Sequence, residues 1–156
     1  MKDTLAQGDA VEWLGVTYRT ILDAADSGGA MSIVDSVSPP DSGPPRHVHE
    51  REDEAFVVLS GEIEWWMEGR RGNAGPGDTV FVPRGCEHTF RVVGDLPCRH
   101  LVILTPGGFD GFFREMAEGG YAIPEDMEAI EASATRHHLR FTGPPLAADG
   151  AEGDGA

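Results

Sequence analysis

Short runs of β-branched and aromatic residues, each bounded by glycine or proline, follow one another from residue 11 to residue 105. The chain has 21 glycines and 11 prolines among its 156 residues, scattered without a repeat. Runs this short suit strands better than helices, and the residues between them are typical of turns. About eight strands at this spacing predict an all-β sandwich or closed barrel. We expect the strands within residues 11–22, 31–37, 54–59, 62–67, 79–82, 88–93 and 99–104.

Two segments between these runs are expected to be loops. Residues 38–46 contain four prolines, which have no backbone N–H to donate to a neighbouring strand. Residues 69–77, with the sequence GRRGNAGPG, are rich in residues that favour turns.

The hydrophobic period changes after residue 106. Phe109, Phe112, Phe113 and Met116 are spaced i, i+3, i+4 and i+7, which predicts an amphipathic helix. A second helical stretch begins near Pro124, and a short final segment follows it. We therefore expect an N-terminal arm at 1–10, a β-barrel at 11–106, a helical C-terminal extension at 107–146 and a disordered acidic tail at 147–156.

The charge and the cysteine content exclude several classes of partner and location. The net charge is −15, with 27 acidic and 12 basic residues, so we expect no nucleic-acid partner and no anionic membrane partner. Two cysteines do not form a disulfide framework. The sequence has neither a signal peptide at its start nor an apolar run long enough to span a bilayer. These features predict a cytoplasmic protein.

The segment from His47 to Glu54 carries the clearest chemical signal. His47 and His49 are two residues apart, so an extended strand places both imidazoles on one face. Glu54 follows after a polar turn and can return beside them on the next strand. Imidazoles with one carboxylate suit divalent Fe, Ni, Co, Cu, Mn or Zn. His88, which follows a Pro-x-Gly turn at the start of a strand, offers a further ligand.

Both segments resemble the two sequence motifs of the cupin superfamily, G-x5-H-x-H-x4-E-x6-G and G-x5-P-x-G-x2-H-x3-N. The matching positions are His47, His49, Glu54 and Gly61 in the first motif, and Gly77, Pro83, Gly85 and His88 in the second. Two positions depart from the pattern. Asp41 stands where the first motif begins with glycine, and Val92 stands where the second often has asparagine.

The resemblance implies a single cupin domain, a double-stranded β-helix or jelly-roll barrel, with one divalent metal held by His47, His49, Glu54 and His88. Four protein ligands leave one or two coordination positions open, which is typical of a catalytic metal. The chain is similar to quercetin-dioxygenase-like cupins, and this likeness favours a dioxygenase acting on an enolisable or phenolic small molecule. Glu54 is then the expected catalytic base. The alternatives are a redox-silent polyketide cyclase or isomerase and a non-catalytic module that binds a small hydrophobic or aromatic molecule.

Other residues have two interpretations each. Cys86 either lines the pocket or, as we favour, is a small buried hydrophobe. His100 either contacts the substrate or acts as a proton shuttle, or it is a structural histidine. Glu50, Glu52 and Asp53 are expected to form a solvated turn.

Two sets of apolar residues each have two interpretations: packing inside the domain, or contact with a ligand or a partner. The four apolar residues of the first helix either cap the barrel mouth or pack the helix onto the barrel, and we favour packing. Trp13, Leu14 and Tyr18 are a large apolar set for an edge strand. We therefore expect a homodimer with residues 11–22 near the contact.

Overall fold

The computed structural model describes residues 10–147, and within them the chain forms eleven strands and two helices. The strands are β1 (Ala10–Trp13), β2 (Val16–Leu22), β3 (Ser32–Ser38), β4 (Pro45–His49), β5 (Asp53–Ser60), β6 (Glu62–Met67), β7 (Arg70–Ala74), β8 (Thr79–Val82), β9 (His88–Val93), β10 (Cys98–Thr105) and β11 (Leu139–Pro145). The helices are α1 (Asp110–Gly119) and α2 (Met127–Arg136).

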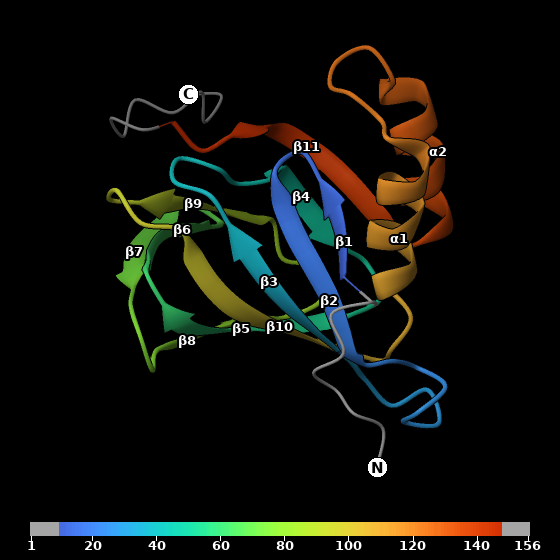
Figure 1. Cartoon of the computed structure of the whole chain (residues 1–156), viewed down its shortest axis with the longest axis horizontal. Coiled ribbons are helices and arrows are strands. Elements are labelled where there is room, and N and C mark those ends of the chain that lie inside the picture. Colours follow the sequence, from blue (N-terminus) through green and yellow to red (C-terminus); the bar gives the residue numbers. More distant parts are fainter. Residues whose placement is uncertain (1–9, 148–156) are drawn as a thin grey trace.

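The strands form two antiparallel sheets that enclose a common interior (Figure 1). The six-stranded sheet has the order β1-β2-β3-β10-β5-β8, and the five-stranded sheet has the order β11-β4-β9-β6-β7. Consecutive strands such as β4 and β5 therefore lie in different sheets, as in a double-stranded β-helix. The prediction of an all-β barrel with two short helices is confirmed.

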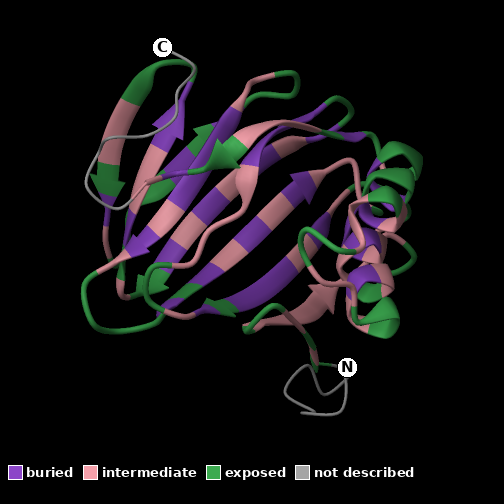
Figure 2. Cartoon of the chain, turned by 90° about the horizontal axis from the view of Figure 1, so that it is seen from above, coloured by how far each residue is buried: buried purple, intermediate pink, exposed green. Residues whose placement is uncertain are grey.

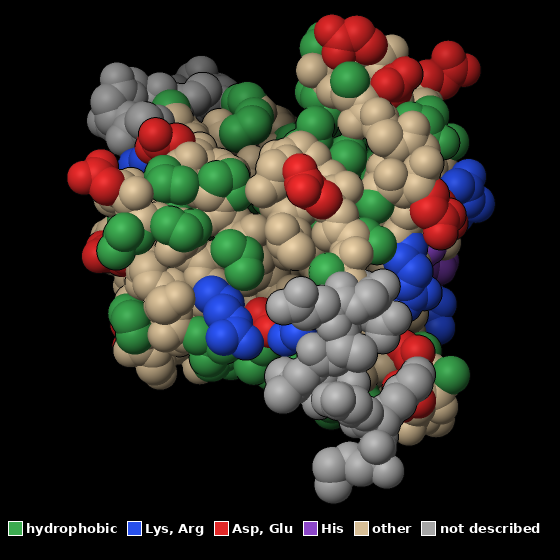
Figure 3. Space-filling view, in the orientation of Figure 1, with side chains coloured by type: hydrophobic (Ala, Val, Ile, Leu, Met, Phe, Trp, Pro, Cys, Tyr) green, Lys and Arg blue, Asp and Glu red, His purple; other side chains and the backbone are tan. Residues whose placement is uncertain are grey.

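The inner faces of both sheets are apolar because side chains alternate along each strand. Buried and partly exposed residues follow one another along β5 and β10, and Figure 2 shows this alternation as bands across the sheets. The centre of the core includes Val34, Val58, Ile63, Val92 and Leu104, all 0–1% exposed. Acidic side chains are scattered over the face shown in Figure 3, so the negative charge does not gather in one patch there.

One prediction about strands and loops becomes more specific, and another is wrong. Residues 11–22 form two strands, because Leu14 and Gly15 both have positive φ and make a tight turn between β1 and β2. Residues 70–74 form strand β7, although they were expected to be part of a loop. Glu68 and Gly69, with φ of 46° and 84°, turn the chain so that β7 pairs with β6.

The loop before β4, expected over residues 38–46, is shorter than expected. Pro45 and Arg46 belong to β4, where Pro45 is the first residue of the strand and pairs with Pro145 of β11. A proline is accepted there because the first position of a strand need not donate to the ladder.

The segment 107–146 contains both helices, which lie side by side at one end of the sheets (Figure 1). Phe112 and Met116 of α1 are buried, and Gly120 ends the helix with left-handed φ. The short final segment expected after the second helical stretch forms β11, which pairs with β4 in the five-stranded sheet. Residues 1–9 of the expected arm and 148–156 of the expected tail lie outside the described residues.

Two of the three residues behind the dimer expectation face inward. The indole N–H of Trp13 donates to the carbonyl of Tyr121 at 2.8 Å, and the Tyr18 ring stacks on Phe113 with 4.2 Å between centroids. Leu14 is 53% exposed. The homodimer stays a prediction, which light scattering can test. Of the helices in the described part of the chain, none has the length and apolar character needed to cross a membrane.

Candidate metal centre

Three strands bring His47, His49, Glu54 and His88 together. His47 and His49 lie on one face of β4, and His88, the first residue of β9, pairs directly with His47. Glu54 comes from β5 in the opposite sheet. One ligand atom from each of the four side chains lies within 4.8 Å of all the others. All four residues are buried, with 2–7% of their surface exposed.

The turns beside these strands fix where the side chains point. The backbone N–H of Gly85 donates to the carbonyl of His49 at 2.8 Å, which ties the β8–β9 turn to the end of β4. Within that turn the N–H of Cys86 donates to the carbonyl of Pro83 at 3.1 Å. The Pro-x-Gly turn thus delivers His88 to the neighbourhood of His49.

Backbone carbonyls orient two of the imidazoles. Nδ1 of His47 lies 2.7 Å from the carbonyl oxygen of Pro45, and Nδ1 of His88 lies 2.9 Å from that of Cys86. A carbonyl can only accept, so each Nδ1 carries a proton, and in the neutral ring Nε2 then has the lone pair that binds a metal. Such hydrogen bonds to the far ring nitrogen are typical of histidines that bind metals.

Each carboxylate oxygen of Glu54 faces one histidine. Oε1 lies 3.1 Å from Nε2 of His88, and Oε2 lies 3.1 Å from Nε2 of His49. Three imidazole nitrogens and one carboxylate therefore converge on one point, and this donor set fits a divalent transition metal.

The electrostatics of the four residues also suit a cation. Burial, reinforced by the nearby His88 and His49, holds the pKa of His47 well below its usual value, so this ring is neutral at pH 7. Burial acts to raise the pKa of Glu54, but His49 and His88 outweigh it and hold that pKa well below the ordinary value. Burial acts to lower the pKa of His49, and the Glu54 carboxylate reverses this and raises it. Glu54 is therefore ionised.

Glu52 is a site residue that the sequence interpretation missed. It was expected in a solvated turn, but only 4% of its surface is exposed. Its Oε2 lies 3.9 Å from Nδ1 of His49, and burial raises the pKa of its carboxyl group. The expectation holds for Glu50, which is exposed and paired with Arg140 at 2.9 Å. Nothing in the spacing of the sequence distinguishes Glu52 from Glu50.

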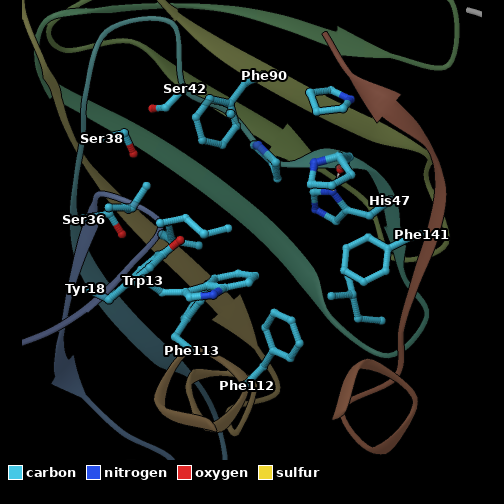
Figure 4. A pocket seen from close by; sticks show the side chains of 18 of the residues that line it. Trp13, Tyr18, Ser36, Ser38, Ser42, His47, Phe90, Phe112, Phe113 and Phe141 are labelled. Atoms are coloured by element: carbon cyan, nitrogen blue, oxygen red, sulfur yellow. Dashed lines mark hydrogen bonds between the residues drawn. The ribbon is translucent and has the colours of Figure 1, made fainter. Parts of the chain in front are cut away.

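The metal centre borders an apolar cavity of about 410 Å³. Exposed Leu14 and Ile123 lie where the cavity reaches the surface. Figure 4 shows aromatic side chains from both sheets and from α1 around the interior. The aromatic residues of the wall are Trp13, Tyr18, Phe56, Phe90, Phe109, Phe112, Phe113 and Phe141.

The two interpretations of the first helix both hold. Phe109, Phe112 and Phe113 line the cavity as well as packing α1 onto the barrel, whereas Met116 is buried away from it. The favoured interpretation, packing alone, is therefore incomplete. Phe141 of β11 pairs with His47, so the final strand contributes to the cavity wall beside the metal centre.

His100 and Cys86 differ in their relation to the cavity. His100 lines it and is 3% exposed, with Nε2 3.2 Å from Oγ of Ser38. Cys86 does not line it and packs against the edge of the core, where it is partly buried rather than fully buried as expected. Burial and a hydrogen bond with Glu68 raise the pKa of the Cys86 thiol.

The two departures from the motifs have local explanations. Asp41 has a φ of 65°, the conformation for which glycine is usual, and aspartate is among the residues that tolerate it. Val92 is fully buried in the core. Neither residue contacts the four side chains of the metal centre by a hydrogen bond or ion pair among the described residues.

Comparison with known proteins agrees with this geometry. A family model described as a cupin domain matches residues 35–104. The quercetin 2,3-dioxygenase of Bacillus subtilis (strain 168) is 27% identical over 130 residues, which are 82% of this chain and 36% of that enzyme. The chain thus spans about a third of that relative's length.

Solved structures give the same result. The polyketide cyclase RemF from Streptomyces resistomycificus is 28% identical, with a TM-score of 0.52 over 62% of this chain and 67% of that one. KdgF from Halomonas sp. shares the fold, with a TM-score of 0.56 at 20% identity over 62% of this chain and 84% of that one. The two motifs, the two-sheet barrel and these likenesses together identify residues 35–104 as a cupin domain.

Proposed function

We propose that the chain is a metal-dependent enzyme that oxidises an enolisable or phenolic small molecule with dioxygen. The observation that carries the proposal is the position of His47, His49 and Glu54, which form part of the wall of an aromatic cavity. A cavity of about 410 Å³ with few polar groups suits a small organic molecule. The metal-binding residues would therefore meet a substrate directly.

His47, His49, Glu54 and His88 would hold the ion, and the donor set accepts Fe, Ni, Mn, Co, Cu or Zn. Such an ion supplies Lewis acidity, and a redox-active one also supplies electrons for reaction with dioxygen. The likeness to a quercetin 2,3-dioxygenase over 82% of the chain supports the oxidative reaction.

The chain's own groups have three tasks in this proposal. The aromatic walls hold a flat ring by stacking and edge contacts, and they keep water out of the site. The hydrogen bonds from Nδ1 of His47 and His88 to backbone carbonyls keep both rings in one orientation. Glu54, ionised and facing the cavity, accepts the proton of the substrate hydroxyl at its carboxylate.

A second candidate is a redox-silent cyclase or isomerase. The likeness to the polyketide cyclase RemF, at 28% identity, favours it. In that reaction the same cavity would hold a flexible polyketide, and Glu54 would remove a proton next to a carbonyl group.

The test is to load the protein separately with Fe(II), Ni(II), Mn(II) and Zn(II) and to supply polyphenols, diketones and polyketides. Oxygen uptake and product mass are followed in air and under anaerobic conditions. The proposal expects product only in air and only with a redox-active ion. Equal product with Zn(II) in the absence of oxygen would favour the cyclase, and tight binding without turnover would favour a binding module.

A pair of variants connects the activity to Glu54. Glu54→Gln should abolish turnover because it removes both the base and a metal ligand. Glu50→Gln is the matched control, because Glu50 is exposed and pairs with Arg140 outside the cavity. Loss of activity in the control would show that the assay responds to damage in the β4–β5 turn rather than to the site.

A further inference from the structure

A row of polar side chains crosses the six-stranded sheet at the end of the cavity away from the metal centre. Tyr18 pairs with Ser36, and Ser36 pairs with His100, on neighbouring strands β2, β3 and β10. All three residues line the cavity, as does Ser38. Figure 4 shows the Ser36 and Ser38 side chains across the cavity from His47.

Apolar residues separate this row from the metal centre. Glu54 pairs with Leu104, which is four residues from His100 on the same strand, a span of about 13 Å along the sheet. The Phe56 ring lies between the two ends, with its centroid 6.4 Å from the ring of His88 and 6.0 Å from the ring of His100. The cavity is therefore polar at both ends and aromatic in the middle.

Two polar atoms of the row lack a partner. Nδ1 of His100 and Oγ of Ser36 have no hydrogen bond within residues 10–147, although the two residues are only 3% and 0% exposed. An unsatisfied buried polar group destabilises a folded protein by about 1–3 kcal/mol, so such groups usually have a partner. A ligand in the cavity can provide one.

The state of His100 decides which ligand group fits. Burial lowers the pKa of His100 to about 4, so the ring is neutral at pH 7 and has one donor and one acceptor nitrogen. If the Ser38 hydroxyl donates to Nε2, Nδ1 carries the ring proton and donates to the ligand, and if the hydroxyl accepts from Nε2, Nδ1 accepts from the ligand. The Ser36 hydroxyl is equally adaptable, which suits a hydroxyl or carbonyl group and disfavours a charged one.

We propose that Ser36 and His100 form a second polar subsite, which binds a hydroxyl or carbonyl oxygen at the end of the substrate remote from Glu54. This inference rests on the proposed function for the reacting end. It specifies an elongated aromatic substrate that carries oxygen at both ends. Ser36 and His100 would then discriminate between substrates, whereas the metal centre would react with them.

The experiment compares the binding of two probes, 3-hydroxyflavone and 3,4′-dihydroxyflavone, which differ by one hydroxyl at the far end. Calorimetry is done on metal-free protein and repeated with Zn(II), so that binding is measured without turnover. We expect the dihydroxy probe to bind about tenfold more tightly to the wild type, the usual gain from one buried hydrogen-bonded group.

Three variants locate the source of that preference. Ser36→Ala and His100→Phe should reduce the tenfold ratio to about one and leave the affinity for 3-hydroxyflavone within about twofold. Ser42→Ala is the matched control, because Ser42 also lines the cavity but already donates to the carbonyl of Pro39 at 2.6 Å. This control should keep the tenfold ratio. Thermal unfolding of each variant checks that it is folded. If His100→Phe does not fold, Ser36→Ala alone tests the proposal.

The inference is overturned by a ratio of one in the wild type, by a ratio that survives in Ser36→Ala, or by failure of both probes to bind. Its failure is distinguishable from that of the proposed function. A tenfold ratio without oxygen uptake would leave the subsite standing and reject the dioxygenase. Oxygen uptake without the ratio would do the reverse.

Discussion

The two ends of the cavity differ in how completely the chain satisfies its own polar groups. At the metal centre, His47 and His88 contact backbone carbonyls, and both oxygens of Glu54 face a histidine. At the opposite end, Ser36 and His100 each retain an atom without a hydrogen-bond partner in the described chain. Apart from Nδ1 of His49, which also lacks a partner among the described residues, the first end is organised before anything binds, and the second is completed by what binds. Metal-binding geometry and substrate recognition are thus built by different means.

Removing two ligands gives the largest expected effect on this comparison. The double variant His47→Ala, His49→Ala should lose the metal, from about one ion per chain to none, because the two residues supply half of the donor set. Elemental analysis after purification without chelator measures this. His100→Phe is the control from the other end and should keep the ion. If the double variant still holds one ion per chain, the assignment of ligands is wrong.

The next largest expected effect is on the pH dependence of stability, and it comes from His100 at the end of the cavity away from the metal centre. The pKa of His100 is about 4 in the folded chain and about 6.5 when unfolded, so between these values the unfolded chain binds the extra proton. The contribution of His100 is fully present above about pH 6.5 and is lost as the pH falls to about 4. The difference of about 2.5 pKa units corresponds to about 3 kcal/mol.

Urea unfolding of metal-free wild type and His100→Phe from pH 7 to pH 4 measures this loss. The free energy of unfolding of the wild type should fall more steeply, since His47 titrates in both proteins and its effect cancels. Parallel curves for the two proteins would mean that His100 is not a neutral buried group.

Glu52 is the exception at the metal end, and its replacement should have a smaller effect. Nδ1 of His49 and Oε2 of Glu52 lie 3.9 Å apart, and neither has a hydrogen-bond partner among residues 10–147. A carboxylate behind a metal-binding histidine makes it a better ligand, so Glu52→Gln should weaken Zn(II) binding about tenfold. Competition with a chromogenic chelator measures the affinity. Glu50→Gln, two residues away and exposed, should bind Zn(II) like the wild type.

How well the sequence predicts each end of the cavity depends on how far apart in the sequence its interacting residues lie. His47, His49 and Glu54 lie within eight residues, and His88 follows its own Pro-x-Gly turn, so local spacing was enough to group them. Tyr18, Ser36 and His100 become neighbours only through the pairing of β2, β3 and β10. No local pattern encodes that pairing, and His100 was left with two interpretations.

The errors in the fold have the same origin. Residues 70–74 contain glycine and asparagine, which favour turns, but pairing with β6 overrides this preference, and Gly72 leaves room for the ring of Trp65. A Cβ at Gly72 would lie 2.5 Å from that ring. Strand β11 was likewise not predicted, because its partner β4 is about ninety residues earlier.

The smallest predicted effect concerns the loop between β3 and β4, which lines the cavity near Ser42. Asp41 occupies the position of the motif's glycine with a φ of 65°, so Asp41→Gly should relieve a strained conformation. The substitution also increases the conformational entropy of the unfolded chain and removes an ion pair between exposed Asp41 and Arg91 at 3.2 Å. These terms oppose one another, and the free energy of unfolding should change by no more than about 0.5 kcal/mol. Gly43→Ala is the contrast, because its Cβ would lie 1.9 Å from the carbonyl oxygen of Phe90 and should cost about 1–3 kcal/mol. Urea unfolding of both variants measures the difference, and a large loss in Asp41→Gly would mean that the Asp41 side chain, rather than Gly43, holds this loop in place.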